Sequence, residues 1–307
     1  MAPRTAQARG AAAEAACLLL DLSHDEVSIV THELCDPLRP LLAVHLSSTA
    51  KGLWVPMQEQ LAELRQRHAE AAAFARFAGF QSCAALADAD ELELGAHPMH
   101  NRPLSIAHWR ALGMLFGCGS LPKLVALSII ADDNGDEGVV SLADGLRRSR
   151  MPVLIAFQLL RAEIGPQGAT ALASALTKRA LPSLEHLSLS ANPLGDAGLA
   201  TLLPALRQHP KLDTVHLAGT NISDESVASL VAQPTKLKSL ENLYIGHNQI
   251  TDAGCATLAS ALRGGALPAL YRLDVQNNPA SGEATDAVFA SRSGLAEGYE
   301  ESDDEAD

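Results

Sequence analysis

The sequence predicts an α/β solenoid in which one strand–turn–helix unit is repeated about seven times. The first observation is the segment 181–209, LPSLEHLSLSANPLGDAGLATLLPALRQH, which begins with leucines at strand spacing. Leu184, Leu187 and Leu189 are followed by Asn192 at a turn, and then by further leucines at helical spacing. The second observation is that this unit recurs along the chain at a fixed period, which is typical of solenoids.

The recurrence is visible at three strand positions, all of them apolar in every repeat. The first is occupied by Leu124, Leu154, Leu184, Leu212, Leu240 and Leu270, at steps of 30, 30, 28, 28 and 30 residues. The second is occupied by Leu127, Phe157, Leu187, Val215, Leu243 and Leu273, and the third by Ile129, Leu159, Leu189, Leu217, Ile245 and Val275. The glycine that opens each helix recurs as Gly138, Gly168, Gly198 and Gly254, with Ser226 and Ala284 in the other two repeats. Each repeat is therefore expected to form one strand and one helix.

These repeats resemble leucine-rich repeats of the ribonuclease-inhibitor type, through the L-x-x-L-x-L strand, the asparagine after it, the D-x-G before the helix and the 28- and 30-residue steps. The resemblance covers Leu124 to about Ala290. It implies a curved solenoid with a parallel sheet on the concave side and helices on the convex side. The family includes inhibitors, GTPase activators, immune sensors and ligase adapters, so the resemblance does not by itself predict a function.

One further repeat is expected before Leu124. Glu91 to Leu94 reads as a strand with Ala89 at the leading position, 35 residues before Leu124. Terminal repeats of solenoids are commonly atypical, and we therefore count this as the seventh repeat. A loop from Gly95 to Pro103 is expected to connect this strand to its helix.

The sequence divides into four regions around these repeats. Residues 1–17 are predicted to be a disordered or helical start, and residues 18–88 a helical N-terminal cap with a long helix from Met57 to Phe80. The solenoid is predicted to occupy residues 89–290. Residues 291–307 are predicted to be a disordered acidic tail, because seven of the eleven residues from 297 onward are acids.

The segment 22–54, LSHDEVSIVTHELCDPLRPLLAVHLSSTAKGLW, resembles an F-box. The matching residues are Leu22, Val27, Val30, Leu34, Asp36, Pro37, Val44 and Trp54. Ser23 stands where the family usually has proline, and Lys51 is the one basic residue shortly before Trp54. The resemblance implies a substrate adapter of a ubiquitin ligase. A plain helical cap that shields the first repeat explains the same residues, because a solenoid end needs a cover.

Composition narrows the class of function. The 307-residue chain has a net charge of −13, which argues against nucleic acid as a partner. The five cysteines are scattered without a C-x-x-C pair, which favours a reduced intracellular compartment, and we expect a monomer in the cytoplasm with the nucleus as an alternative location. No apolar run approaches the ~20 residues of a membrane-spanning helix, so no membrane association is expected.

The search for chemical sites predicts no catalytic residue, no cofactor and no metal. No nucleophile–base pair and no phosphate-binding G-x-x-x-x-G-K motif is present. His97, His100 and His108 are close in sequence, but they have no partner cysteine or fixed carboxylate, which is why we favour ordinary histidines over a metal site. The chain is therefore predicted not to be an enzyme.

Asparagines at the turn after the strand are predicted to form a structural ladder. Asn192, Asn248 and Asn278 occupy this position, where an amide can donate to and accept from the backbone of neighbouring turns. Ser188, Leu189, Ser190, Asn192 and Gly195 also resemble a motif of the Ran GTPase activator, in which the asparagine assists GTP hydrolysis. Ala191 replaces the acid of that motif, and the structural role is favoured.

The concave face of the sheet is the predicted binding surface. Its first outward row reads Ala126, Ala156, His186, Thr214, Asn242 and Arg272, and its second reads Ser128, Gln158, Ser188, His216, Tyr244 and Asp274. Aromatic residues and arginine are enriched at binding hot spots. We therefore predict a non-catalytic module that binds another protein through the C-terminal part of this face, with the ligase adapter and the GTPase activator as alternatives. The predicted contact residues are His186, His216, Tyr244, His247, Arg272 and Asp274.

Overall fold

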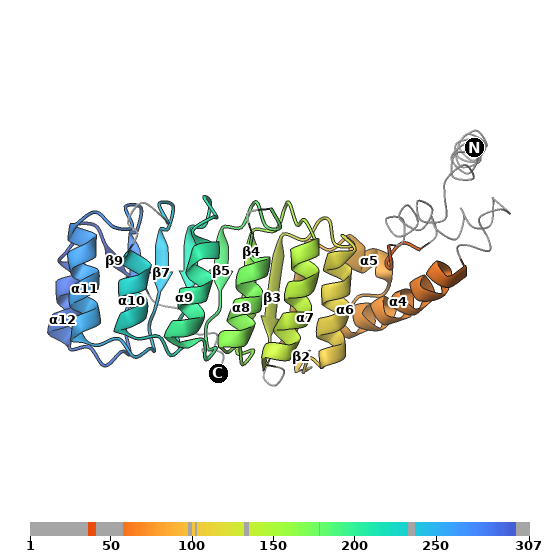
Figure 1. The fold of residues 1–307 in the computed structure, drawn as a ribbon, viewed down its shortest axis with the longest axis horizontal. Helices are drawn as coiled ribbons and strands as arrows, with labels where there is room; N and C mark the ends of the chain where they lie inside the picture. The colour runs from red at the N-terminus through yellow and green to blue at the C-terminus, as the bar shows by residue number, and fades with distance from the viewer. Residues whose placement is uncertain are drawn as a thin grey trace.

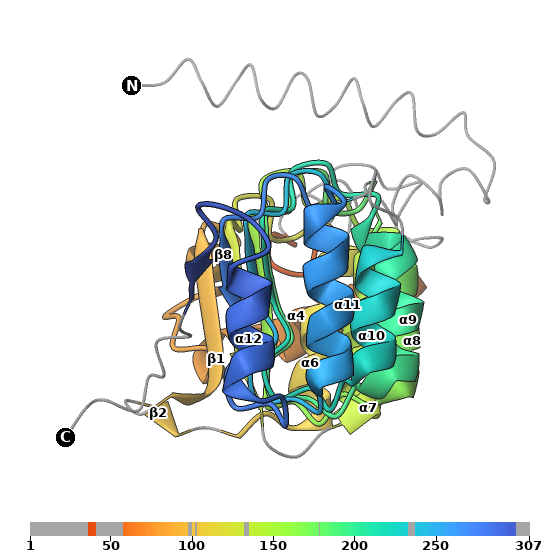
Figure 2. The same ribbon diagram turned by 90° about the vertical axis from the view of Figure 1, so that its left-hand side faces the viewer.

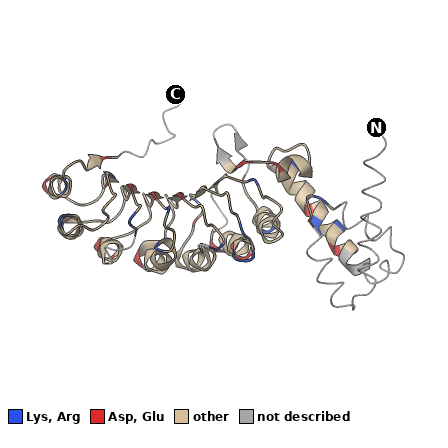
Figure 3. Ribbon diagram, turned by 90° about the horizontal axis from the view of Figure 1, so that it is seen from above, with Lys and Arg blue, Asp and Glu red and all other residues tan. Residues whose placement is uncertain are grey.

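The chain forms a curved row of strand–helix units, with the strands on the inner side and the helices on the outer side (Figures 1 and 3). The computed structural model describes residues 36–40, 58–97, 100–101, 103–131, 135–177, 179–232 and 237–298. In this part, nine strands form one sheet in the order β2-β1-β3-β4-β5-β6-β7-β8-β9. β1 pairs antiparallel with β2, and every other neighbouring pair is parallel. The predicted α/β solenoid is thus confirmed.

The strands are β1 (Glu91–His97), β2 (His100–Asn101), β3 (Ala126–Ile130), β4 (Ala156–Leu160), β5 (His186–Ser188), β6 (Thr214–His216), β7 (Asn242–Tyr244), β8 (Arg272–Asp274) and β9 (Ala296–Glu297). The helices of the repeats are α6 (Ile106–Gly117), α7 (Gly135–Arg148), α8 (Pro166–Ala175), α9 (Gly195–Leu206), α10 (Asp224–Val231), α11 (Asp252–Arg263) and α12 (Gly282–Phe289). Two further helices, α4 (Gln58–Phe77) and α5 (Cys83–Ala87), precede β1. The end-on view shows the repeat helices stacked behind one another on one side of the sheet (Figure 2).

The core lies between the sheet and the helices. The three apolar positions of each strand point into it, and Leu184, Leu187 and Leu189 are fully buried. The register aligns equivalent positions of neighbouring repeats, for example Leu127 with Phe157. Because each repeat packs on the next, one continuous apolar core extends from α4 to α12.

Aspartates at the helix starts join successive repeats on the outer side. Asp196 is in the first turn of α9, and its carboxylate accepts hydrogen bonds from the backbone N–H of Ser223 at 2.8 Å and from the hydroxyls of Ser223 and Ser226 in the next repeat. Asp224 likewise accepts from Thr251, and Asp252 from Ser281. Each carboxylate therefore satisfies amide groups at the N-terminus of the following helix, where negative charge is also favoured by the helix dipole.

This contact explains the recurring glycine of the D-x-G pattern. A Cβ atom at Gly168 would lie 2.5 Å from a carboxylate oxygen of Asp136, and one at Gly254 would lie 2.2 Å from Asp224. Glycine leaves space for the carboxylate of the preceding repeat. Ser226, which replaces the glycine in one repeat, donates its hydroxyl to that carboxylate instead.

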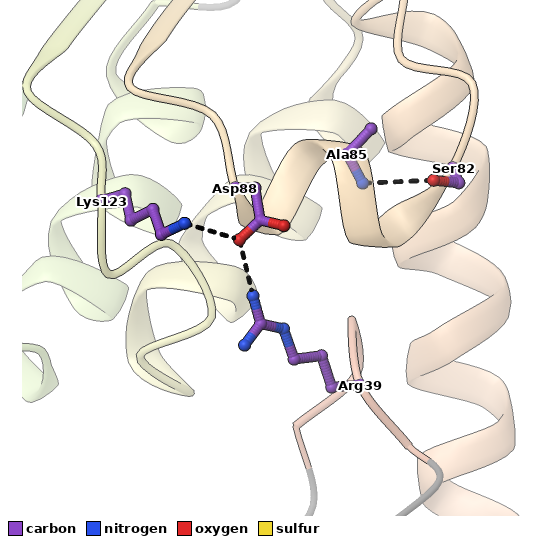
Figure 4. Close-up of polar contacts among 5 residues, drawn as sticks. All are labelled: Arg39, Ser82, Ala85, Asp88 and Lys123. Carbon is purple, nitrogen blue, oxygen red and sulfur yellow. Dashed lines mark hydrogen bonds and ion pairs between the residues drawn. The ribbon is translucent and has the colours of Figure 1, made fainter. Parts of the chain in front are cut away.

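The first repeat is covered by α4, α5 and the short segment Asp36–Pro40. Leu38 is buried, and Asp36 Oδ1 accepts from the hydroxyl of Ser120 at 2.7 Å. The Asp88 carboxylate lies between Arg39 and Lys123, at 2.9 and 3.1 Å, beside the Ser82 hydroxyl that caps α5 (Figure 4). These contacts hold Asp36–Pro40 against the solenoid. The remainder of the F-box-like segment, and with it residues 1–35, lies outside the described residues.

The N-terminal strand differs from its expected extent. The sequence predicts a loop from Gly95 to Pro103, whereas β1 continues to His97 and forms a hairpin with β2, with His97 opposite His100. Gly95 makes this possible, because its φ is +106° and a Cβ atom there would lie 1.6 Å from the Ile130 carbonyl oxygen. Within the described residues, no helix is long and apolar enough to cross a membrane.

The C-terminal end also differs from the expectation, which placed the end of the solenoid at residue 290. After α12, the Arg292 guanidinium donates to the carbonyls of Leu262, Ala266, Leu267 and Leu270, and so covers the end of α11. The chain then returns to the sheet as β9. The N–H groups of Ala296 and Gly298 donate to carbonyls of Tyr271 and Leu273. The open hydrogen-bonding groups of the last strand therefore recruit a segment whose own sequence has no strand pattern.

Candidate functional site

The ladder of asparagines fixes the turns at the end of the strands. Asn192 is fully buried, and its Oδ1 accepts from the N–H groups of Ala162 and Ile164 at 2.9 and 3.1 Å. Its Nδ2 lies 2.8–3.1 Å from three carbonyl oxygens, those of Leu159, Leu189 and Ser190. One amide thereby joins the turns of two successive repeats.

The same arrangement continues toward the C-terminus. Asn248 accepts from the N–H groups of Thr220 and Ile222, and Asn278 accepts from those of Asn248 and Ile250. Thr220 occupies the ladder position of the intervening repeat, where its hydroxyl donates to the Leu217 carbonyl at 2.7 Å. The ladder holds the C-terminal ends of β5 to β8 in a fixed register.

This geometry bears on the GTPase-activator motif around Asn192. The amide oxygen and the amide nitrogen are both engaged with the backbone, and no part of the side chain is exposed. A catalytic asparagine must reach the substrate or its attacking water. In this structure, the Asn192 amide is hydrogen-bonded to backbone N–H and carbonyl groups.

The C-terminal part of the concave face combines buried and exposed side chains. The rings of His216 and Tyr244 are stacked, with centroids 4.1 Å apart and planes inclined by 13°. Tyr244 is only 7% exposed, and its hydrogen bond to Arg272 raises the pKa of that guanidinium. Arg272 is itself exposed and lies over the Tyr271 ring, 5.7 Å from its centroid.

In this region Asp274 is buried, and the last described residues pack against Tyr244. Asp274 is 5% exposed and accepts from the N–H of Gln276 at 2.9 Å. A Cβ atom at Gly246 would lie 2.5 Å from its carboxylate, so any other residue there would displace the carboxylate. Gly298 lies against Tyr244 and Arg272, since a Cβ atom on it would be 3.2 Å from the tyrosine ring and 2.6 Å from the arginine Cγ. The end of the described chain thus covers Tyr244.

The six predicted contact residues consequently divide into two groups. His186 and His216 are half-buried, and His247 and Arg272 are exposed. Tyr244 and Asp274 are buried beneath them. Sequence reasoning missed Tyr271, which is 44% exposed. Its position directly after the leading leucine forms another outward row, which could have indicated it.

A cluster of charged groups lies at the start of β5 and β6. His186 Nδ1 is 3.2 Å from Asp213 Oδ1, and Lys211 Nζ is 3.6 Å from Glu185 Oε1. Ligand atoms of Glu185, His186 and Asp213 lie within 4.8 Å of one another, a donor set that a divalent cation accepts. Lys211 already supplies positive charge to Glu185 within this cluster.

The three histidines near β1 are separated by the fold. His97 and His100 are paired in the backbone register of the hairpin, whereas His108 belongs to α6. The His108 ring stacks on Phe77 at 3.6 Å, and its Nδ1 accepts from the N–H of Ser105. Burial lowers the pKa of His108 and favours the neutral ring. Its role is to cap α6 and to join α6 to α4.

Comparison with known proteins identifies the repeat. A family model described as "Leucine Rich repeat" matches residues 180–203 and 236–259. Three solved structures are similar at low identity. A protein from Bacteroides fragilis is 15% identical over 57% of this chain and 67% of its own, with a TM-score of 0.36.

The other two structures are similar over larger shares of this chain. TLR13 in a complex with ssRNA13 is 18% identical over 69% of this chain and 36% of its own, with a TM-score of 0.26. An internalin from Listeria monocytogenes is 13% identical over 74% and 93%, with a TM-score of 0.24. The two matched repeats, together with the parallel sheet and its row of helices, show that this chain is a leucine-rich repeat solenoid.

Proposed function

We propose that this chain is a non-catalytic interaction module that binds another protein through the concave face of β5 to β8. The observation that carries the proposal is the group of side chains on the outward rows that the core does not use. Arg272, Tyr271 and His247 are exposed, and His186 and His216 are half-buried. Inward packing on the same strands is complete without them. Arginine and tyrosine are also the side chains that most often dominate binding energy.

The buried residues beneath this surface support it as a rigid platform. Tyr244 stacks on His216 and is hydrogen-bonded to Arg272. The asparagine ladder fixes the C-terminal ends of the same strands. Side chains that are held in place before binding lose less conformational entropy when a partner arrives. We therefore assign Tyr244 and Asp274 the role of positioning the exposed residues.

The described residues contain no observation that favours either alternative function over this one. Asn192 is saturated by backbone groups, as described above. The described part of the F-box-like segment, Asp36–Pro40, packs on the solenoid. The coarser statement, a leucine-rich repeat interaction module, is also the one that the matched repeats support.

The test uses a partner purified with the full chain and then titrated against variants. The double variant Arg272→Ala with Tyr271→Ala removes the exposed cation and ring but no core contact. We expect at least about a 30-fold loss of affinity, since paired hot-spot residues contribute ~2 kcal/mol or more. Arg263→Ala on the outer face of α11 is the matched control for the lost charge. Equal affinity of the double variant and the wild type would overturn the proposal.

A further inference from the structure

A row of acidic residues crosses the starts of β5, β6 and β7, directly after the leading leucines. Glu185, Asp213 and Glu241 occupy this row on three successive repeats. The Asp213 N–H donates to the Glu185 carbonyl and the Glu241 N–H to the Asp213 carbonyl, which keeps the three residues side by side. Neighbouring strands are ~4.8 Å apart. Like charges on adjacent strands repel each other, and the row therefore favours a cation.

Two basic side chains lie beside this row but do not neutralise it. Lys211 Nζ is 3.6 Å from Glu185 Oε1, and His186 Nδ1 is 3.2 Å from Asp213 Oδ1. Glu241 is exposed and has no ion-pair partner in the part of the chain that the structure describes. When the imidazole is neutral, Lys211 offsets the charge of a single carboxylate. The start of these strands therefore keeps a net negative charge.

The contact between His186 and Asp213 is not a directed hydrogen bond. Asp213 Oδ1 is buried, and no N–H or O–H group of the described residues donates to it in hydrogen-bond geometry, although His186 Nδ1 is only 3.2 Å away. A buried acceptor without a donor is costly, and a cation would remove that cost. Two ligand atoms that each lie about 2.1 Å from one tetrahedral Zn²⁺ are ~3.4 Å apart. The nitrogen and the oxygen are thus spaced as neighbouring ligands of one ion.

Glu185 supplies a third ligand atom. One atom each of Glu185, His186 and Asp213 lies within 4.8 Å of the other two, and all three side chains are half-buried. The parallel pairing of β5 with β6 fixes the backbone beneath them. Because 4.8 Å exceeds the spacing of tetrahedral ligands, the long Glu185 side chain has to turn toward the other two. An imidazole nitrogen together with carboxylate oxygens suits Zn²⁺ better than Mg²⁺ or Ca²⁺.

We propose that Glu185, His186 and Asp213 form a Zn²⁺ site that joins the starts of β5 and β6. Three protein ligands leave the fourth tetrahedral position to water. Lys211 competes with the ion for Glu185, so that binding of the ion displaces an existing ion pair. Spacing along the chain does not indicate this site, because Asp213 belongs to the repeat after that of His186. The inference does not depend on the proposed function, since the site needs no partner protein.

The experiment titrates Zn²⁺ alone into the full-length chain, after a chelator has removed bound metal, and follows binding by calorimetry. Other histidines and cysteines of the chain can also bind Zn²⁺, so only binding that depends on the three residues is assigned to them. His186→Ala and Asp213→Asn each remove a ligand and should weaken this binding at least about tenfold. Zn²⁺ should also raise the melting temperature of the wild type more than that of either variant.

Two further variants make the test specific. Asp144→Asn makes the same substitution at an exposed carboxylate on α7, and it should bind Zn²⁺ within about twofold of wild type. Lys211→Met removes the cation that competes for Glu185 and should tighten binding about threefold or more, a gain that a misfolded protein could not give. Wild-type affinity of either His186→Ala or Asp213→Asn, an equal loss for Asp144→Asn, or unchanged affinity of Lys211→Met would each overturn the proposal.

Discussion

The N-terminal and C-terminal halves of the solenoid have the same repeat but are held together by different contacts. β3 pairs with β4 over five residues, whereas β5, β6, β7 and β8 pair over three. The short strands coincide with the asparagine ladder, whose amides add side-chain hydrogen bonds at the turns to backbone bonds such as that from the Leu189 N–H to the His216 carbonyl. In the N-terminal half the strands continue, and the outward positions after the shared three are apolar. The two halves therefore present different residues on the concave face, with Ile130 and Leu160 half-buried in the N-terminal half.

The helices show a parallel difference. α6 and α7 approach closely at Gly113 and Gly145, where a Cβ atom at Gly145 would lie 1.9 Å from the Gly113 carbonyl oxygen. Aspartates tie successive helix starts in both halves, through Asp136 between α7 and α8 and through Asp196, Asp224 and Asp252 toward the C-terminus. The N-terminal half therefore combines close backbone approach with the aspartate link. The predictions below test this difference.

The largest effect is expected from Asn192→Ala. The substitution leaves two buried N–H groups and three carbonyls without the amide, and each unsatisfied group costs about 1–3 kcal/mol unless water replaces the partner. We expect a loss of at least about 3 kcal/mol in the free energy of unfolding, measured by urea denaturation. Thr220→Val removes only the contacts of one hydroxyl, to the Leu217 carbonyl and to Asn248 Oδ1, at the ladder position of another repeat and should cost about 1 kcal/mol. An unchanged urea midpoint for Asn192→Ala would contradict the structural role.

Gly145→Ala should have the next largest effect and acts on the N-terminal half. The added methyl group overlaps the Gly113 carbonyl, so α6 and α7 must move apart. We expect a loss of about 2 kcal/mol, seen as a lower melting temperature. Gly282→Ala, in α12, is the control, because nothing lies within 4 Å of its Cβ position. A Gly145→Ala protein as stable as the control would show that the close approach is not needed.

Asp196→Ala tests the link between helix starts, and we expect a loss of about 1–2 kcal/mol at neutral pH. Burial opposes the charge on Asp196, but hydrogen bonds from Ser223 and Ser226 outweigh it and hold its pKa below the usual value. A pKa lowered by folding stabilises the protein above the unfolded-state pKa. The difference between wild type and variant should therefore shrink as the pH falls through the lowered pKa.

Urea denaturation at neutral pH and at about pH 3 would measure this change. A difference that stays constant over that range would show that the Asp196 charge does not contribute. Asp136→Ala offers the comparison with the N-terminal half, where the carboxylate accepts from the backbone N–H groups of Gly165 and Gly168.

The smallest effect is a gain in stability from Ala191→Gly. Ala191 has a φ of +56°, in the left-handed region that disfavours residues with a Cβ atom. Gly219 occupies the equivalent turn of the next repeat, with a φ of +64°. We expect a gain of about 0.5–1 kcal/mol, since relief of strain is partly offset by the larger entropy of glycine in the unfolded chain. A melting temperature lower than wild type would contradict this account.

Much of the solenoid could be predicted because its information is local and periodic. Leu184, Leu187 and Leu189 specify an inward strand face by themselves, and the constant period aligns them with the same positions of the next repeat. The Asn192 ladder position followed from the same alignment. The reason for the glycine in D-x-G did not, because its partner, the aspartate of the preceding repeat, lies about 30 residues away and has no local pattern.

The sequence by itself determined the repeat, the inward faces and the outward rows, since these depend on spacing along one strand or helix. Only the tertiary structure decided which outward residues are exposed. Tyr244 and Arg272 both lie on outward rows of neighbouring strands, yet Tyr244 is buried because the chain end returns as β9 and places Gly298 against it. Likewise, Glu91 lies beside Ala126 only because β1 pairs with β3. Exposure depends on every segment that packs nearby, and that information is not contained in the spacing of one segment.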